Sequence, residues 1–417
     1  MLEMLRSRNW SGLFGYFLFI GMMSAGYYYN LTFVQLGLED FGRNVLRLNS
    51  QGVARAMALL ALMTCFIAIA FGWYMQRRGW GRDFRLKLRL SFGVVLMQTV
   101  LTLICISVTT ESGFLVWLAG VSLTLGVGVP VMFSMTIDLI PVRMRGAAAA
   151  LITASAYFFA ETLSSEWTFE AFRRQSLIML LGGVTGMGLL AFARHPWLDA
   201  LAKQHLQPAF AIGRFARLGL SKWRISGLIF IMFGIYFVDS LGFLRLLKTP
   251  IYMTSAWQSP EFNTRAFIAV THVIGALAAG ALYPALRTRS LFLWIFGTFA
   301  LAHLQYNFHI QTGSVNAVLS MPMLYALAVS LYTVINFAVW ADLSTPETIS
   351  LNSALGVALS AWTATFLSTS LAVYWDERLP LDLHIRIVNS LAMLFFVAML
   401  ALSFFEPIQS PKRKFSS

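Results

Sequence analysis

Charged residues in this chain are confined almost entirely to the gaps between twelve long apolar stretches. Most of these stretches are 17 to 27 residues long, and a helix needs about 20 residues to cross the ~30 Å hydrocarbon core of a bilayer. The pattern predicts an all-α, polytopic membrane protein with twelve transmembrane helices. The stretches are 11–37, 56–75, 90–108, 114–137, 147–163, 175–193, 225–244, 266–286, 290–310, 317–341, 351–374 and 387–405.

Basic residues are sorted between the two sides of the predicted membrane domain. When the gaps are assigned alternately, the side that holds both termini carries 21 of the 31 Lys and Arg residues. By the positive-inside rule both termini are expected to be cytoplasmic, in the cell (inner) membrane. The net charge of +13 is therefore topological. No basic stretch is interleaved with exposed aromatic residues, so we expect a lipid bilayer and a small-molecule solute as partners, no nucleic acid, and a monomer.

The chain carries little sign of processing, redox or metal chemistry. Its start, MLEMLRSRNWSG, leads into a 27-residue apolar run that is too long for a signal-peptide core, so we expect it to be retained as the first helix. Cys65 and Cys105 both fall inside apolar stretches and are expected to be packing residues. We predict no disulfide framework, no metal site and no cofactor.

The twelve stretches divide into two similar sets of six. Corresponding stretches begin 200 to 214 residues apart, which predicts a duplicated six-helix unit. Asp138 follows the fourth stretch as Asp342 follows the tenth, and Gly72 ends the second stretch much as Gly280 nears the end of the eighth. We therefore predict an N-terminal bundle over 1–193, a basic cytoplasmic linker over 194–224 that includes a short helix on the membrane surface, and a C-terminal bundle over 225–417 with a short basic tail.

Two short motifs carry a resemblance to a known family. The segment 72–79 resembles the loop after the second helix of the major facilitator superfamily, whose pattern is G-x-x-x-D-R-x-G-R-R/K. Its two glycines and Arg77 match, whereas Gln76 stands where the family has an acidic residue. The segment 138–146 resembles the family's stretch between helices 4 and 5, an acidic residue followed by P-x-x-x-R-G. The resemblance implies two pseudo-symmetric six-helix bundles and a transporter, and it says nothing of the substrate.

The same residues suggest a cytoplasmic gate. An Asp at the cytoplasmic end of one helix can pair with an Arg of a neighbouring helix and hold that face closed. We expect Asp138 to pair with Arg77 or Arg78 and so to join helices 2 and 4. The alternative is that the arginines only set topology and contact lipid phosphates. The expected gate consists of Gly72, Arg77, Arg78, Asp138, Arg143 and Arg145.

Ionisable residues inside the apolar stretches are few, so each is a candidate for function. Asp239 lies in the outer half of stretch 7, and Glu161 lies near the outer end of stretch 5. A carboxylate in hydrocarbon is costly unless it faces a wet cavity or a partner, so we expect Asp239 to couple transport to a proton, with Glu161 as the second candidate. The alternatives are a buried pair of Asp239 with a Lys, Arg or His of another helix, and an interfacial position for Glu161.

Polar side chains on other stretches are candidates for the lining of a cavity. Tyr325, Tyr332 and Asn336 are spaced by seven and four residues, which puts them on one helical face. Three adjacent tyrosines, Tyr27–Tyr29, point around most of a helix, so at least one of them should face the interior. From these and the neighbouring Asn30 we choose Tyr28 and Asn30. The alternatives are interfacial tyrosines and hydrogen bonds between helices. The predicted cavity residues are Tyr28, Asn30, His272, Tyr325, Tyr332 and Asn336, with His303 as a weaker candidate.

Absent motifs narrow the choice of function. No GxxxxGK[ST] nucleotide loop occurs, which argues against an ATP-driven pump, and no HExxH or GxSxG motif points to an enzyme. We predict a secondary active transporter of a small, neutral or amphipathic solute that works by alternating access, with proton coupling through Asp239. The alternative is a non-transporting assembly or scaffold protein on the same fold. A midplane cavity with convergent polar groups would favour transport, whereas an interior filled with Phe and Met would favour a scaffold.

Overall fold

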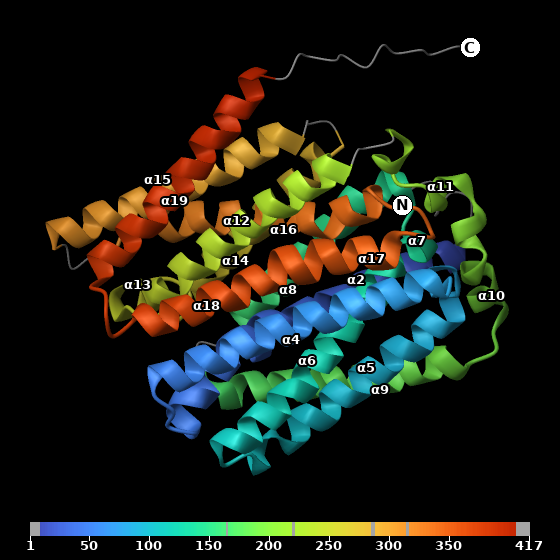
Figure 1. The fold of residues 1–417 in the computed structure, drawn as a ribbon, viewed down its shortest axis with the longest axis horizontal. Coiled ribbons are helices and arrows are strands. Elements are labelled where there is room, and N and C mark those ends of the chain that lie inside the picture. Colours follow the sequence, from blue (N-terminus) through green and yellow to red (C-terminus); the bar gives the residue numbers. More distant parts are fainter. Residues whose placement is uncertain (1–8, 164–165, 219–221, 285–287, 314–316, 406–417) are drawn as a thin grey trace.

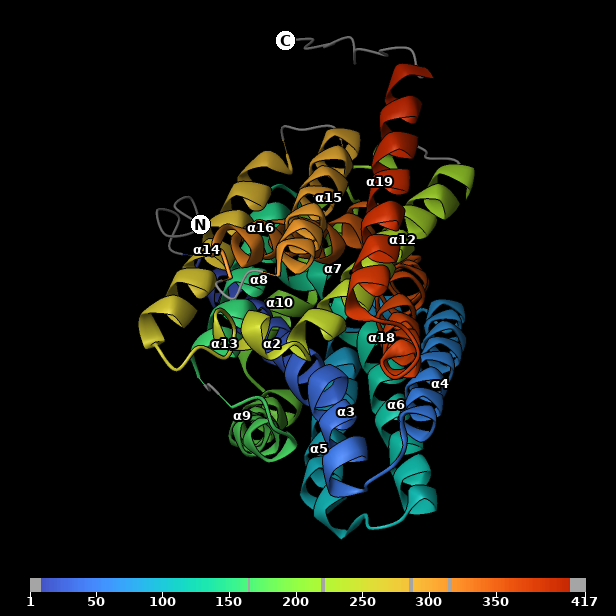
Figure 2. The same cartoon turned by 90° about the vertical axis from the view of Figure 1, so that its left-hand side faces the viewer.

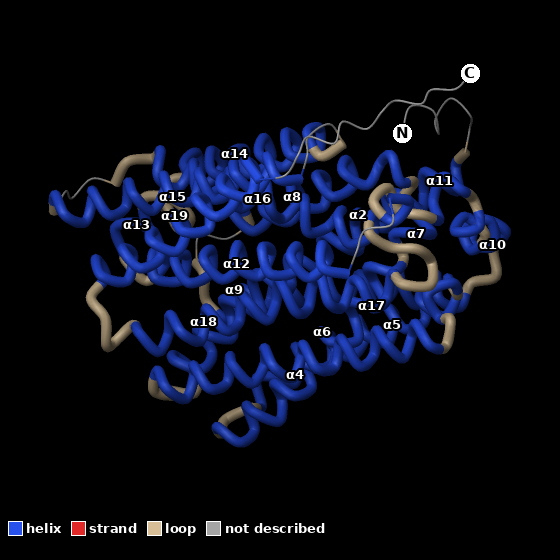
Figure 3. Tube along the Cα trace, turned by 45° about the horizontal axis from the view of Figure 1, so that its top comes forward, coloured by secondary structure: helices blue, strands red, loops and turns tan. Residues whose placement is uncertain are grey.

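Long helices make up nearly all of the protein, whose structure is a computed structural model. It describes residues 9–163, 166–218, 222–284, 288–313 and 317–405, and no strand occurs among them (Figure 3). Nine of the described helices are long and apolar enough to cross a membrane, by length and composition. Each apolar stretch of the sequence lies in a long helix wherever the chain is described, so the predicted all-α membrane fold is confirmed.

The long helices follow one another in two sets. The first set is α2 (Trp10–Tyr29), α4 (Ser50–Arg77), α5 (Phe84–Ile104), α6 (Glu111–Ser134), α8 (Arg145–Thr162) and α9 (Phe169–Phe192). The second set is α12 (Lys222–Leu247), α14 (Phe262–Leu282), α15 (Thr288–Thr312), α16 (Ser320–Asp342), α17 (Ile349–Ser353) with its continuation α18 (Ala364–Trp375), and α19 (Leu381–Phe405). Polar caps start several of them; for example, the Asn49 side chain accepts from the Gly52 amide at 2.7 Å at the start of α4.

Most of the long helices run roughly along the long axis of the molecule, and short helices gather at its two ends (Figure 1). The short helices α7 (Thr136–Leu139), α10 (Pro196–Ala202) and α11 (Pro208–Ala211) lie at one end, which we call the linker end. The short helix α13 (Pro250–Thr254) lies at the other end, which we call the far end. Figure 2 looks onto the far end, where α3 (Leu38–Asp40) also lies.

The two sets of helices meet through glycines. A Cβ atom on Gly280 of α14 would lie 2.6 Å from the Cβ of Ala150 and 2.8 Å from the carbonyl oxygen of Gly146, both in α8. A Cβ atom on Gly72 of α4 would lie 2.9 Å from the carbonyl oxygen of Ser350 in α17. Small residues let membrane helices approach closely, so Gly72 and Gly280, which correspond in the duplicated sequence, both serve crossings between the sets.

Two helices depart from regular α geometry beside the centre of the molecule. The helix that starts as α2 widens into a π-helical segment, η1 (Asn30–Gly37), and a second such segment, η8 (Ala354–Thr363), joins α17 to α18. The Asn30 amide donates to the Gly26 carbonyl at 2.7 Å, and the Thr363 hydroxyl donates to the Ala358 carbonyl at 2.7 Å. π-Helical turns are rare and frequently occur at functional sites, and here both border the same cavity.

Candidate functional site

A cavity lies between the two sets of helices, bordered by η1, α8, α12, α14, α16 and α18. Its empty space, including its opening, is about 840 Å³, in the range of small-molecule sites. Most of the lining is apolar or aromatic, and among the described residues that line it there is no Lys or Arg. Six predicted site residues line it: Asn30, Glu161, Asp239, His272, Tyr325 and Tyr332.

Asp239 of α12 is buried and is held by two tyrosines of α16. The Tyr325 hydroxyl donates to Oδ1 at 2.6 Å, and the Tyr332 hydroxyl donates to Oδ2 at 2.5 Å. The seven-residue spacing puts both tyrosines on the face of α16 that meets α12. In the described part of the chain no Lys, Arg or His forms an ion pair with Asp239, so the alternative of a buried pair with a basic residue is not what the structure contains.

Glu161 of α8 is 3% exposed, and its Oε2 atom has no hydrogen-bond partner among the described residues. Three other polar atoms of the cavity lining share this property: Asn30 Oδ1, Tyr236 Oη and Trp167 Nε1. Polar groups buried without a partner cost free energy, typically ~1–3 kcal/mol each. A molecule bound in the cavity could supply the hydrogen-bond partners that these buried atoms lack.

Aromatic side chains join the two sets of helices across the cavity. The hydroxyls of Tyr27 in α2 and Tyr157 in α8 lie 2.7 Å apart, and Tyr157 stacks on the His272 ring of α14 with centroids 4.3 Å apart. His272 in turn lies 2.9 Å from the Ser330 hydroxyl through Nδ1. His272 is therefore a cavity residue with a fixed orientation.

A smaller cavity adjoins the first and contains Asn336. The two share Tyr27, Asn30 and Trp362 as lining residues. Asn336 Oδ1 accepts from the Trp340 indole at 2.8 Å, so this side chain is partly occupied by a neighbour on its own helix. Helices α5 and α6 line the smaller cavity, which extends the polar region into the first set of helices.

Two of the residues singled out in the sequence lie elsewhere. Tyr28 was predicted to line the cavity, but its hydroxyl donates to Gln175 Oε1 of α9 at 2.5 Å, and Tyr27 lines the cavity in its place. His303 is buried in α15, where its Nδ1 lies 2.8 Å from the Phe299 carbonyl oxygen of the same helix. Tyr28 is wrong as a cavity residue because the rotation of α2 about its axis, which packing sets, decides which of three adjacent tyrosines points inward.

Several lining residues were missed in the sequence. Tyr236 lies three residues before Asp239 and so on the same face of α12, a spacing that could have indicated it. Tyr157 and the tryptophans Trp167, Trp257 and Trp362 carry no comparable local signal, because an aromatic residue in an apolar stretch is equally at home against lipid.

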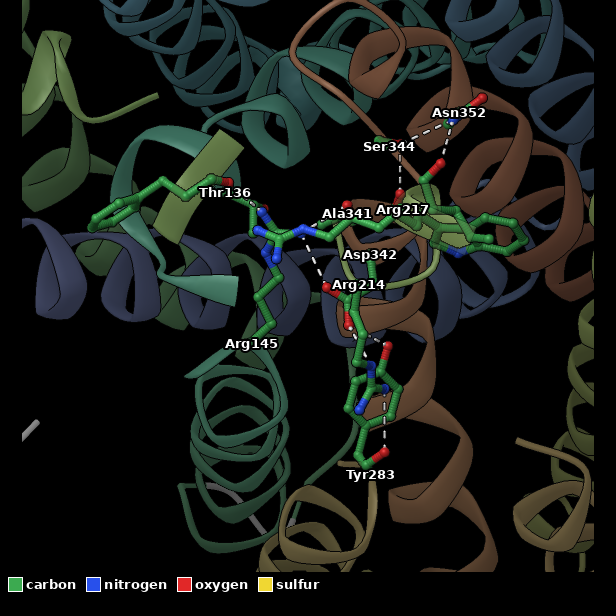
Figure 4. A network of polar contacts seen from close by, with 12 residues as sticks. Thr136, Arg145, Arg214, Arg217, Tyr283, Ala341, Asp342, Ser344 and Asn352 are labelled. Atoms are coloured by element: carbon green, nitrogen blue, oxygen red, sulfur yellow. Dashed lines mark hydrogen bonds and ion pairs between the residues drawn. The ribbon is translucent and has the colours of Figure 1, made fainter. Parts of the chain in front are cut away.

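A buried ion pair joins the two sets of helices at the linker end (Figure 4). Arg145 Nη1 of α8 donates to Asp342 Oδ1 of α16 at 3.0 Å, and both side chains are 1% exposed. The Tyr283 hydroxyl donates to Asp342 Oδ2 at 3.0 Å, and burial, followed by the nearby charge of Asp342, raises the pKa of Tyr283 well above its ordinary value. Arg214, from the segment between the sets, lies 3.7 Å from the same carboxylate oxygen. We call Arg145, Arg214, Tyr283 and Asp342 the linker-end network.

The linker segment is bonded directly to this network. The Phe215 amide donates to the Asp342 carbonyl at 2.8 Å, and Arg145 Nη2 donates to the Phe210 carbonyl at 2.8 Å. A Cβ atom on Gly213 would lie 2.4 Å from the Asp342 carbonyl oxygen, so only glycine fits this approach. Asp342 was noted in the sequence only as the counterpart of Asp138, and its role in closing this end comes from the structure.

The predicted pairing of Asp138 with Arg77 or Arg78 is wrong. Asp138 is fully buried and forms an ion pair with Lys87 of α5, while Asp138 Oδ1 lies 3.2 Å from His205 Nδ1 of the linker. The guanidinium groups of Arg77 and Arg78 instead lie over Trp73 and Tyr74 of their own helix. Helix α5 lies beside α6 and carries Lys87 at the depth of Asp138. The Lys87 amine is therefore the ion-pair partner of Asp138 that we had predicted to be an arginine at the end of α4.

The remaining residues of the expected gate fall into two classes. Gly72 lies in the crossing of α4 and α17, and Arg145 belongs to the linker-end network. Arg143 is exposed and borders a surface recess that also includes Arg214 and Asp342. Arg145, rather than Arg77 or Arg78, thus forms the ion pair between the two sets of helices at this end.

A second set of ion pairs joins the helices at the far end. Lys248 Nζ, which follows α12, lies 3.0 Å from Glu39 Oε1 of α3 and 3.1 Å from Asp376 Oδ2, which follows α18. Arg43 of the first set lies 3.1 Å from the same Asp376 oxygen, and Arg245 pairs with Asp376 as well. We call Glu39, Arg43, Arg245, Lys248 and Asp376 the far-end network.

The titration of Lys248 should shift the equilibrium between a closed and an open far end. Burial lowers the pKa of Lys248 to about 8, although Glu39 acts in the opposite direction. If this end opens, Lys248 regains water and an ordinary pKa of about 10.4. The closed form binds the proton less well, so raising the pH from 7 to 9 is expected to favour closure about tenfold. Distances between spin labels on Ser112 and Asn263, exposed on the two sets of helices, would report this change.

Two variants make that test specific. Lys248→Met removes the titrating group, and Lys248→Arg keeps its charge up to pH 9, so neither should show the pH step. A step of equal size in Lys248→Met would assign it to another group and contradict the prediction.

Among the described residues no group of three or more His, Cys, Asp or Glu could hold a metal ion.

Comparisons with known proteins find a similar fold but no similar sequence. The sequence matches no protein-family model and no curated protein sequence. The fold, however, is similar to the proton:xylose symporter XylE bound to 6-bromo-6-deoxy-D-glucose, described as a major facilitator superfamily protein, with 11% identity over 94% of this chain and 96% of that chain and a TM-score of 0.61. The human organic anion transporter MFSD10 gives 12% identity over 93% and 99% of the two chains and a TM-score of 0.64.

A third structure, XylE from E. coli in a partially occluded inward-open conformation, is 14% identical over 95% of this chain and 98% of that chain, with a TM-score of 0.61. Coverage of this extent means that the likeness is not limited to one set of helices. At these identities it concerns the fold.

Proposed function

Since the chain has the major facilitator fold, we propose that it is a secondary membrane transporter that moves a small, amphipathic solute by alternating access. The observation that carries this proposal is the central cavity, which lies between the two sets of helices and gathers Asp239, Glu161 and His272. Networks of ion pairs join the sets at both ends of the molecule. Such a site between two six-helix units, with a separable contact at each end, is what alternating access requires.

In this proposal the bundles 1–193 and 225–417 rock about the cavity, and the segment 194–224 connects them as a linker. Breaking the linker-end network would open one side, and breaking the far-end network would open the other. Proton coupling is assigned to Asp239, whose carboxylate lies at the cavity and touches no basic side chain in the described chain. The working unit is a monomer, because one chain supplies both halves of the site.

The linker end is proposed to face the cytoplasm, on the distribution of basic residues. In a chain without Cys65 and Cys105, Ser112→Cys should react with an impermeant thiol reagent in intact cells, and Gln207→Cys should react after permeabilisation only. The reverse pattern would invert the orientation.

The function is tested by comparing the metabolites of cells with and without the protein. A transporter should change the cellular content of one solute or a small set of related solutes. Ala160 lines the cavity, so Ala160→Phe should abolish the difference by filling the site while the protein remains in the membrane. The alternative, a scaffold, predicts no solute that differs, and a phenotype that survives Ala160→Phe. The cavity between the two sets of helices, with its few convergent polar groups, favours transport over that alternative.

A further inference from the structure

We propose that the central cavity takes a lipophilic organic cation, an ammonium group joined to an apolar ring-sized body, and that Glu161 recognises the ammonium. This inference rests on the proposed transport function and adds the class of substrate to it. Three observations carry it: the balance of charge in the cavity, the unpartnered atoms of its wall, and its aromatic lining.

Two carboxyl groups of the cavity have no basic partner among the described residues of the protein. Asp239 and Glu161 both line the cavity, and no Lys or Arg lines it among the described residues. The basic group whose field reaches Glu161 is Arg265 of α14, but Arg265 Nη1 donates to the Ser259 carbonyl at 2.5 Å and the guanidinium lies over Phe262. Neither group forms an ion pair with the other. A buried carboxylate without a partner favours a cation in its place.

The two carboxylates differ in their remaining capacity to accept hydrogen bonds. Both oxygens of Asp239 already accept from tyrosine hydroxyls, whereas Glu161 Oε2 has no partner and its side chain is almost fully buried. Asn30 Oδ1 is also unpartnered in the same wall. A carboxylate and an amide oxygen can accept hydrogen bonds but cannot donate them. They would be satisfied by N–H groups, and an alkylammonium carries these together with the positive charge.

The rest of the lining suits an apolar body. Tyr27, Phe243, Trp257 and Trp362 contribute rings to the cavity, and aromatic faces attract cations by ~0.5–2 kcal/mol in addition to burying apolar area. An organic anion would meet two carboxylates and no basic side chain. A neutral solute would bring no positive charge to pair with the ionised form of Glu161. The expected amphipathic solute therefore becomes a cationic one, with Glu161 as its recognition residue and Asp239 left for the proton.

Three probes of one shape test this inference: phenethylamine, 2-phenylethanol and 3-phenylpropionate, which are cationic, neutral and anionic at pH 7. Binding to the purified full chain in lipid nanodiscs is measured by calorimetry and by fluorescence of the cavity tryptophans. We expect phenethylamine to bind about tenfold or more tightly than the other two. Glu161→Gln should remove that preference, whereas Asp239→Asn should retain it. Asp382→Asn, in an exposed pair with Arg386, is the matched control and should behave as the wild type.

Several results would overturn the inference. They are equal affinity for the three probes, preference for the carboxylate probe, no measurable phenethylamine binding, or a preference that persists in Glu161→Gln. The glutamine variant keeps the size of the side chain and breaks no hydrogen bond, so its elution on size exclusion should match the wild type. The outcome is separable from the proposed function. If cells show a transported solute that is neutral or anionic, transport stands and the substrate class fails. If phenethylamine binds as expected but no solute differs between cells, the site stands and transport fails.

Discussion

Replacing Asp239 by Asn is expected to abolish accumulation of the transported solute against a gradient, while downhill exchange continues. The carboxylate lies in a cavity between the two sets of helices and is held by the hydroxyls of Tyr325 and Tyr332. It could bind a proton when the cavity is open to one side and release it on the other. An amide keeps the size of the side chain but cannot carry that proton, so the solute flux would lose its link to the proton gradient.

The measurement uses proteoliposomes with an imposed pH difference and the solute found in the comparison of cells. One proton exchanged per solute and a difference of one pH unit can hold a roughly tenfold gradient in an electroneutral cycle. We expect Asp239→Asn to equilibrate at a ratio of about one, with counterflow near the wild-type rate. Asp382→Asn, at a residue that does not line the cavity, serves as the control for reconstitution. Wild-type accumulation in Asp239→Asn would move the coupling role to Glu161.

Loss of expression and thermal stability in Asp239→Asn would indicate a structural role for this carboxylate. Asp239 accepts two hydrogen bonds from buried hydroxyls, and an asparagine amide can accept only through its oxygen. A large drop in melting temperature together with the loss of downhill exchange would assign Asp239 a structural role rather than a coupling role.

Replacing Asp342 by Asn is expected to open the linker end. Asp342 is the one carboxylate of the linker-end network, and it faces Arg145, Arg214 and Tyr283. Removing one partner of a buried ion pair leaves the other uncompensated, at a typical cost of ~3–5 kcal/mol. Opening lets Arg145 regain water, so this cost falls mainly on the closed arrangement. At about 1.4 kcal/mol per factor of ten, such a difference shifts a two-state population by a factor between about 10² and 10⁴.

Spin labels on Arg78, directly after α4, and on Leu282 of α14, both exposed near the linker end, would measure the opening. We expect a longer distance to dominate in Asp342→Asn and turnover to fall more than binding does. The double variant Arg145→Met, Asp342→Leu removes both charges of the buried pair and should recover part of the closed population, since the guanidinium that remains, that of Arg214, is 33% exposed and can reach water. An unchanged distance distribution in Asp342→Asn would show that the network does not hold this end closed.

Ion pairs join the two sets of helices at both ends of the structure. The linker-end network and the far-end network each contain residues from both sets of helices, so neither end can open without breaking ion pairs. The two differ in strength, because the linker-end pair is 1% exposed on both sides while the side chains of Lys248, Glu39 and Asp376 are 13–20% exposed. Exposed pairs contribute less, so the far end is expected to open more readily.

The sequence alone determined the helices and most of the charged cavity residues. A hydrocarbon layer demands apolar runs of about 20 residues, and that requirement leaves a strong, local signal in the chain. For the same reason a carboxylate inside such a run is rare. Asp239 and Glu161 could therefore be identified as candidate functional residues without any knowledge of their neighbours. The polar face of α16 was also predictable, because its period is a property of one helix.

The tertiary structure decided which residues meet. Asp138 pairs with Lys87 rather than with Arg77, and Asp342 meets Arg145 across the two sets of helices. Tyr27 rather than Tyr28 faces the cavity. Each of these outcomes depends on the rotation and depth of one helix relative to another, and these are set by glycine crossings such as that of Gly280 with α8 and by the π-helical segment that begins at Asn30. Helix periodicity fixes which residues share a face, but packing against other helices fixes where that face points.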